Sequence, residues 1–200
     1  MVIYLVLFYV FPSHDLALCR DPSRDVYIRT SPIFSKVSPQ RTRGYREGKI
    51  NLLWFGDDRE KRSYKHIKKN QVDYHKNSLY ICTKGCYDTQ YSTRWTSEVT
   101  PQDVIRDKNI DVILFPKGTS PWRILDGILS GVFCVMDHRE EAFKQFENYG
   151  YFGNLNDGIE FFRYNPRKVY ERIYRGQQWV EKEYTLLNVY LDWKRGLLLE

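Results

Sequence analysis

Residues 110–136 read IDVILFPKGTSPWRILDGILSGVFCVM, with an apolar run at each end and a helical segment between them. The runs 110–115 and 132–136 are uninterrupted, which is typical of strands that are buried on both faces of a sheet. A serine followed by a proline opens the intervening segment, and this pair predicts a helix over 121–130. Gly131 follows at the position where a left-handed residue commonly ends a helix. The stretch therefore predicts two parallel strands joined by a helix.

Three further runs upstream predict strands over 50–55, 78–82 and 91–95. Uninterrupted apolar strands that alternate with helices are typical of a parallel sheet with helices on both faces. We therefore predict an α/β, doubly wound domain over about 48–200. Residues 1–47 differ, because four prolines divide them into short pieces. They are predicted to form a short N-terminal extension and linker.

Local capping signals place the remaining helices. Thr100 is followed by Pro101 and then by an acidic residue, which predicts a helix start. Asp137, with Glu140 three positions later, resembles a capping box and predicts a helix over 138–149. Two further helices are predicted, a basic one over 59–70 and a long tail that begins at Asn165-Pro166.

The composition indicates a folded domain. Aromatic residues make up 16% of the 200 residues, so the chain has enough apolar area to bury a core. The longest apolar run, 1–11, is shorter than the roughly 18–20 residues of a membrane span, and it lacks the features of a signal peptide. We predict a buried strand there. The four cysteines lack zinc-site spacing, and without a secretion signal they predict reduced thiols in the cytoplasm.

The net charge is +6, and the basic excess lies in the first hundred residues. A basic field of this kind attracts phosphate, whether in nucleotides, nucleic acid or anionic lipid headgroups. The densest basic stretch, 59–69, is either a nucleic-acid patch or a solvated helix face. Because acidic residues are interleaved throughout, nucleic acid is not the expected partner. No transmembrane span is predicted, and a peripheral contact with a membrane surface stays open.

Ligands of open parallel sheets bind where the carboxyl ends of the strands meet. This rule selects the loops 56–59, 95–98 and 116–120, each of which leads toward a helix N-terminus that favours phosphate. In the helix after the last loop, Arg123 and Asp126 are three residues apart and share a face. They can hold a nucleotide through its phosphate and its ribose, or they can form an ordinary surface pair.

The stretch 110–136 resembles the nucleotide-sugar-binding segment of GT-B glycosyltransferases, most closely the family-four, glycogen synthase-like group. Residues 51–56 (NLLWFG) resemble the strand and glycine turn that open the C-terminal domain of that family, and the tail resembles its closing helices. The resemblance covers about residues 48–198. It implies a Rossmann-like fold, the C-terminal half of a GT-B enzyme, and hexosyl transfer from a UDP- or GDP-linked sugar. No metal or other cofactor is implied.

The resemblance also implies roles for individual residues. Asp126 takes the place of the carboxylate that binds the ribose hydroxyls of the donor, and Arg123 matches the basic residue three positions before it. Thr119 and Ser120 match the donors at the helix start that approach the diphosphate. Gly56 falls at the turn where a bulky side chain would block the donor. The other matches are Trp95 and Thr96 beside the nucleobase, and Arg59, Lys61 and Lys117 as cations that neutralise phosphate.

The chain departs from the family pattern in several respects, among them the following. The family usually has glutamate at the position of Asp126, and the first glutamate of its paired motif is replaced by Lys117 and Gly118 nearby. Residues 1–47 are too few for the second parallel sheet of a GT-B enzyme. The acceptor domain is then reduced, or a partner chain or second copy supplies it, or catalysis is lost.

Three other functions stay open. A non-catalytic nucleotide-sugar or carbohydrate binding module fits the missing glutamate and the short N-terminal segment. A basic nucleic-acid-binding α/β protein fits the run 59–69. The acidic pair Asp57-Asp58 fits the metal-binding pair of a GT-A glycosyltransferase, for which a manganese requirement is the discriminating observation.

Overall fold

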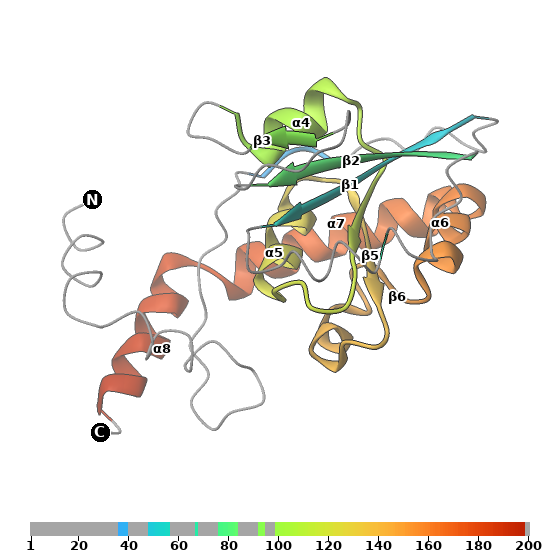
Figure 1. Cartoon of the computed structure of the whole chain (residues 1–200). Coiled ribbons are helices and arrows are strands. Elements are labelled where there is room, and N and C mark those ends of the chain that lie inside the picture. Colours follow the sequence, from blue (N-terminus) through green and yellow to red (C-terminus); the bar gives the residue numbers. More distant parts are fainter. Residues whose placement is uncertain are drawn as a thin grey trace. The chain divides into compact units, whose positions relative to one another are not determined.

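The computed structural model describes residues 36–39, 48–56, 67, 76–83, 92–94 and 99–198. Within these ranges, six strands form one sheet in the order β3-β2-β1-β4-β5-β6, and every neighbouring pair is parallel (Figure 1). The strands are β1 (Ile50–Gly56), β2 (Asn77–Thr83), β3 (Ser92–Arg94), β4 (Val112–Phe115), β5 (Phe133–Asp137) and β6 (Tyr151–Gly153). The α/β class with a parallel sheet is confirmed, and the strand order is consistent with a Rossmann-like fold.

The first strand in the chain, β1, lies at the centre of the sheet. Leu52 of β1 is paired with Leu79 of β2 on one side and with Val112 of β4 on the other. From β1 the chain order runs outward in both directions, through β2 and β3 on one side and through β4 to β6 on the other. The strand order therefore reverses between β1 and β4, where open α/β sheets place their ligands.

Helices cover both faces of this sheet. Those described are α4 (Pro101–Asp107), α5 (Trp122–Leu129), α6 (Leu155–Tyr164), α7 (Pro166–Glu183), α8 (Leu186–Leu198) and the short 3-10 helix η2 (Glu141–Phe146). Leu114 of β4 belongs to a core cluster with Ile159 of α6 and Val169 of α7. The next residue, Phe115, points to the opposite face, where Gly127 of α5 approaches its ring. The two faces thus pack against different helices.

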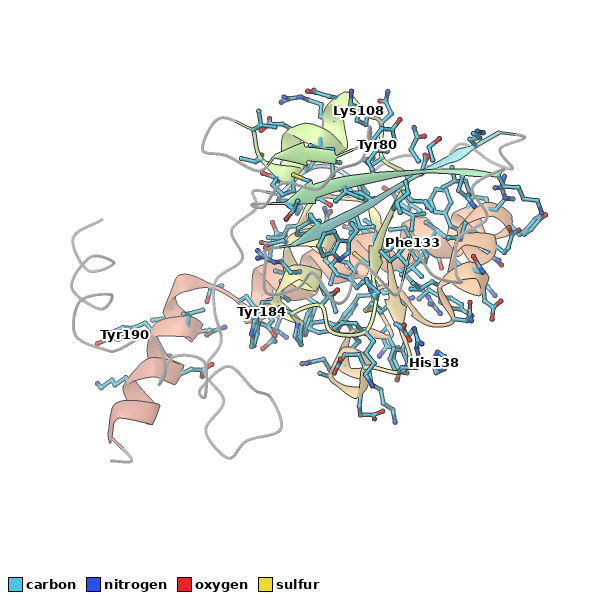
Figure 2. The ribbon with its side chains drawn as sticks, in the orientation of Figure 1. Tyr80, Lys108, Phe133, His138, Tyr184 and Tyr190 are labelled. Carbon is cyan, nitrogen blue, oxygen red and sulfur yellow. The ribbon has the colours of Figure 1, made fainter. Side chains whose placement is uncertain are left out.

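Aromatic rings fill the core on the α6 side. The ring of Phe133 lies 5.9 Å from that of Phe161 and 6.1 Å from that of Phe162, measured between centroids. Figure 2 shows Phe133 in the interior and His138 at the surface beyond the end of β5. Phe133 is fully buried, so its side chain fixes the start of β5 to the face of the sheet that packs against α6 and α7.

The helix starts differ in how well local signals predicted them. Thr100 caps α4 as expected, in a capping box with Asp103 and with Pro101 in the first turn. The predicted helix over 138–149 is wrong, because the Asp137 carboxylate binds Arg139 instead of capping a helix. Only the 3-10 helix η2 forms in that stretch. The sequence predictions also contained no counterpart of β6 or α6.

The described part of the N-terminal extension, residues 36–39, packs on the C-terminal end of α5. The Val37 N–H donates to the Leu129 carbonyl at 2.9 Å. Gln177 of α7 donates from Nε2 to the Val37 carbonyl at 2.6 Å and to the Leu129 carbonyl at 3.2 Å. The rest of 1–47 lies outside the described residues, so the predicted domain boundary stays a prediction.

Contacts between Cα atoms divide the chain into two compact units. The larger unit, Pro32–Val180, contains the sheet. In the smaller unit, the described residues are 181–198, most of which form α8. Among the helices that the structure describes, none is both long enough and apolar enough to cross a bilayer.

Candidate functional site

The candidate site lies at the carboxyl edge of the sheet, where the strand order reverses. Leu53 of β1 is paired with Ile113 of β4. Gly56 and Pro116, each three residues further on, therefore leave the sheet at the same level. The loop 116–121 connects β4 to α5, so the N-terminus of α5 rises from this edge. This is the place where the carboxyl-end rule puts a ligand.

Glycine and proline shape the loop. Gly118 has φ +85°, a left-handed conformation that a side chain rarely adopts. The Thr119 N–H donates back to the Pro116 carbonyl at 3.1 Å, which closes the turn. This turn directs Thr119 inward, and its side chain is only 3% exposed.

The N-terminus of α5 differs from the one predicted. The helix begins at Trp122, and its N-cap is Pro121, which makes no side-chain cap hydrogen bond, so the predicted N-cap Ser120 lies one residue too early. The first turn contains no acidic residue. The Thr119 hydroxyl, just before the helix, is buried and has no hydrogen-bond partner in the part of the chain that the structure describes. A helix start with no acidic residue in its first turn, next to a buried hydroxyl, suits an anionic ligand.

The two residues expected to bind the phosphate and the ribose of a nucleotide both lie on α5. Arg123 is in the first turn, half-buried, and Asp126 is in the second turn and 3% exposed. Gly127 follows Asp126 and packs so closely on the sheet that a Cβ atom would lie 2.9 Å from both the Phe115 ring and the Cys134 sulfur. The close packing of Gly127 fixes the depth at which α5, and with it the Asp126 backbone, sits on the sheet.

A second group of charged residues completes the edge at the end of β5. The buried carboxylate of Asp137 accepts from Arg139 Nε at 2.9 and 3.1 Å, from the Arg139 N–H at 3.0 Å, and from the Lys117 N–H at 3.4 Å. The Glu140 carboxylate accepts from the Gly118 N–H at 3.1 Å. Two successive amides of the 116–121 loop therefore face carboxylate oxygens.

The electrostatics of Asp137 follow from these contacts. Burial by itself would raise the pKa of Asp137, whose side chain is 2% exposed. The hydrogen bonds and the positive charge of Arg139, together with the Lys117 N–H, outweigh burial and hold the pKa below its ordinary value. Asp137 is thus a fixed anion that orients Arg139 beside the loop.

The structure brings together six of the ten predicted site residues at this edge. The 116–121 loop and α5 carry five of them, and β1 ends in the sixth: Lys117, Thr119, Ser120, Arg123, Asp126 and Gly56. The other four lie outside the described residues: Arg59, Lys61, Trp95 and Thr96.

Most residues of the alternative sites predicted from sequence lie outside the described residues. Asp57 and Asp58 lie outside the described residues. In the basic run 59–69 only Ile67 is described, and it is fully buried in the core on the α6 side.

Sequence reasoning missed Asp137, Arg139 and Glu140 as residues of the edge. Their pattern was interpreted as a helix cap, although they directly follow a buried strand. The same carboxyl-end rule that selected the loop after β4 would have selected them.

Comparisons with known proteins add no family: no protein-family model matches the chain, and no curated protein matches its sequence.

Proposed function

We propose that the chain binds a nucleotide sugar at the carboxyl edge, as the doubly wound C-terminal half of a GT-B glycosyltransferase. One observation carries the proposal. The start of α5 at Pro121, the buried Thr119 hydroxyl, which has no hydrogen-bond partner among the described residues, and the buried Asp126 all belong to one loop and helix at the point where the strand order reverses. The Thr119 hydroxyl can donate to a diphosphate, the positive end of the α5 dipole favours its charge, and the Asp126 carboxylate can accept from ribose hydroxyls.

The proposed roles follow the charge that develops during transfer. When the bond between sugar and phosphate breaks, negative charge grows on the departing nucleoside diphosphate. The Thr119 hydroxyl and the positive end of the α5 dipole would stabilise it, with Lys117 and Arg123 adding positive charge. Asp126 would accept hydrogen bonds from the ribose hydroxyls. Gly56 would leave room for the donor beside β1.

Calorimetric titration with UDP and with GDP tests the assignment through Asp126→Asn. We expect the substitution to lower affinity for the preferred nucleotide at least tenfold, because an amide donates where the carboxylate only accepts. Asp107→Asn is the matched control, since Asp107 is an exposed acid on α4 that pairs with Arg106. Equal affinity of Asp126→Asn and Asp107→Asn, with both proteins folded by circular dichroism, would contradict the proposal.

A non-catalytic nucleotide-sugar module is the second candidate function. Lys117 and Gly118 stand near the place of the first glutamate in the family pattern, and the Gly118 N–H is already bound to Glu140. A donor-hydrolysis and transfer assay separates the two functions. Turnover supports the transferase, whereas nucleotide binding without turnover supports the module. A transferase would also need an acceptor-binding part from a second copy or a partner chain.

The cytoplasm is the proposed compartment. Cys82 and Cys134 are free thiols and both are buried. Burial raises the pKa of the Cys82 thiol to about 12, with a smaller contribution from the negative charge of Asp103. Burial likewise raises the pKa of the Cys134 thiol, so both thiols are protonated at neutral pH. Unpaired cysteines are the ordinary state in a reducing compartment.

A further inference from the structure

The Gly118 amide and the Glu140 carboxylate form a contact that the proposed function does not use. Gly118 N–H points to the carboxyl end of β5, and Glu140 Oε2 accepts its hydrogen bond at 3.1 Å. Gly118 lies three residues before the N-cap of α5, in the loop that would receive the diphosphate. A carboxylate therefore occupies a donor that an anionic ligand would also seek.

Glu140 differs from the other acid at this edge. Asp137 is buried and is held by the guanidinium and the backbone N–H of Arg139. Glu140 is partly exposed, precedes η2 and makes no side-chain cap hydrogen bond with that helix. Within the described residues, the Gly118 amide is its one hydrogen-bond donor. Asp137 is thus fixed by several hydrogen bonds, whereas Glu140 is held by one.

We propose that Glu140 is an intramolecular competitor for the diphosphate of the ligand. This inference rests on the proposed function. In the unliganded protein the carboxylate of Glu140 holds the Gly118 amide, and it leaves when a phosphate oxygen takes the same hydrogen bond. Glu140 also repels the ligand through its charge as long as it stays in place. Its presence would make the site selective for ligands whose diphosphate binds strongly enough to displace it.

Glu141 offers a matched control for the test. It is the next residue, it carries the same charge, and its side chain is 81% exposed and paired with Lys144. Glu140→Ala and Glu141→Ala therefore change the net charge equally, and only the first removes the acceptor at Gly118. Should Glu140→Ala fold poorly, Glu140→Gln keeps the side-chain volume and removes only the charge.

Calorimetry with UDP and with inorganic pyrophosphate measures the competition. We expect Glu140→Ala to bind both probes about two- to fivefold more tightly than Glu141→Ala, because an exposed charged contact is worth that much. Equal affinities of the two variants, or weaker binding by Glu140→Ala, would overturn the inference while leaving the proposed function intact.

Hydrogen exchange at the Gly118 amide tests the contact without a ligand. We expect this amide to exchange faster in Glu140→Ala than in the wild type or in Glu141→Ala, and unchanged exchange would overturn the inference. If no protein binds UDP or GDP but Glu140→Ala binds pyrophosphate more tightly, the proposed function fails and the competition stands. If UDP, GDP and pyrophosphate all fail to bind to any of the proteins, both fail.

Discussion

Gly131 shows how one residue ties the N-terminal segment to the sheet domain. It follows α5 with φ +74°, and a Cβ atom there would lie 2.7 Å from the Ser38 carbonyl oxygen and 2.8 Å from that of Val37. Both the left-handed backbone and the closeness of residues 36–39 require glycine. The sequence predicted the first requirement, through the helix end, but contained no signal for the second.

Gly131→Ala should destabilise the protein by about 2 kcal/mol or more, because left-handed strain of about 1–2 kcal/mol adds to the clash with Ser38. Urea unfolding measures the change. Gly48→Ala serves as the control, since a Cβ on Gly48 would meet nothing within 4 Å, and its φ is not in the left-handed region. A Gly131→Ala protein as stable as Gly48→Ala would contradict this account of the turn.

Asp137 links stability to pH. Its pKa is lower in the folded protein than the ordinary value of 3.8, so its contribution to stability is complete above that value. The contribution is lost as the pH falls through the folded-state pKa, because the protonated carboxyl no longer binds Arg139 as an anion.

The melting temperature of wild type should therefore exceed that of Asp137→Asn at pH 7, and the difference should shrink as the pH falls below 3.8. Thermal unfolding followed by circular dichroism across this pH range measures both proteins. A difference that stays constant down to pH 2 would show that Asp137 contributes through shape and not through its charge.

At the scale of elements, strands were more predictable than short helices. The five strands β1 to β5 were predicted within two residues at each end, because uninterrupted apolar runs reflect burial on both faces. The three residues of β6 are too few to show a periodic pattern. The helix predicted after β5 failed because the Asp137 carboxylate had a stronger partner in Arg139 than a helix amide.

The start of α6 has an N-cap residue in the sequence from which the helix could have been predicted. Asn154 caps this helix, and its side chain accepts from the Asn156 N–H.

At the candidate site, the loop after β4 was predictable from the carboxyl-end rule. The contact of Glu140 with Gly118 was not, because it depends on how β5 ends.

The capping box of α4 gives a prediction at this scale. Thr100→Ala removes the side-chain acceptor of the Asp103 N–H, and it should cost about 1 kcal/mol of unfolding free energy. Asp107→Asn, at the other end of the same helix, should change stability by no more than about 0.5 kcal/mol, because its ion pair is exposed. Urea unfolding of the two variants checks the difference. Equal effects would mean that the box does not stabilise α4.

In the molecule as a whole, the proposed binding of a nucleotide sugar is confined to the carboxyl edge of the sheet. The described residues proposed to bind the donor lie at the ends of β1, β4 and β5 and in the first turns of α5. The packing of the other elements holds these ends in register.

Nitrogen-15 chemical-shift mapping during titration with UDP and GDP tests this claim most directly. We predict that the largest amide shifts occur at Gly56, Gly118, Thr119 and Arg123, around the start of α5. Shifts confined to the basic run 59–69, or to α7 and α8, would contradict the claim that the carboxyl edge binds the nucleotide.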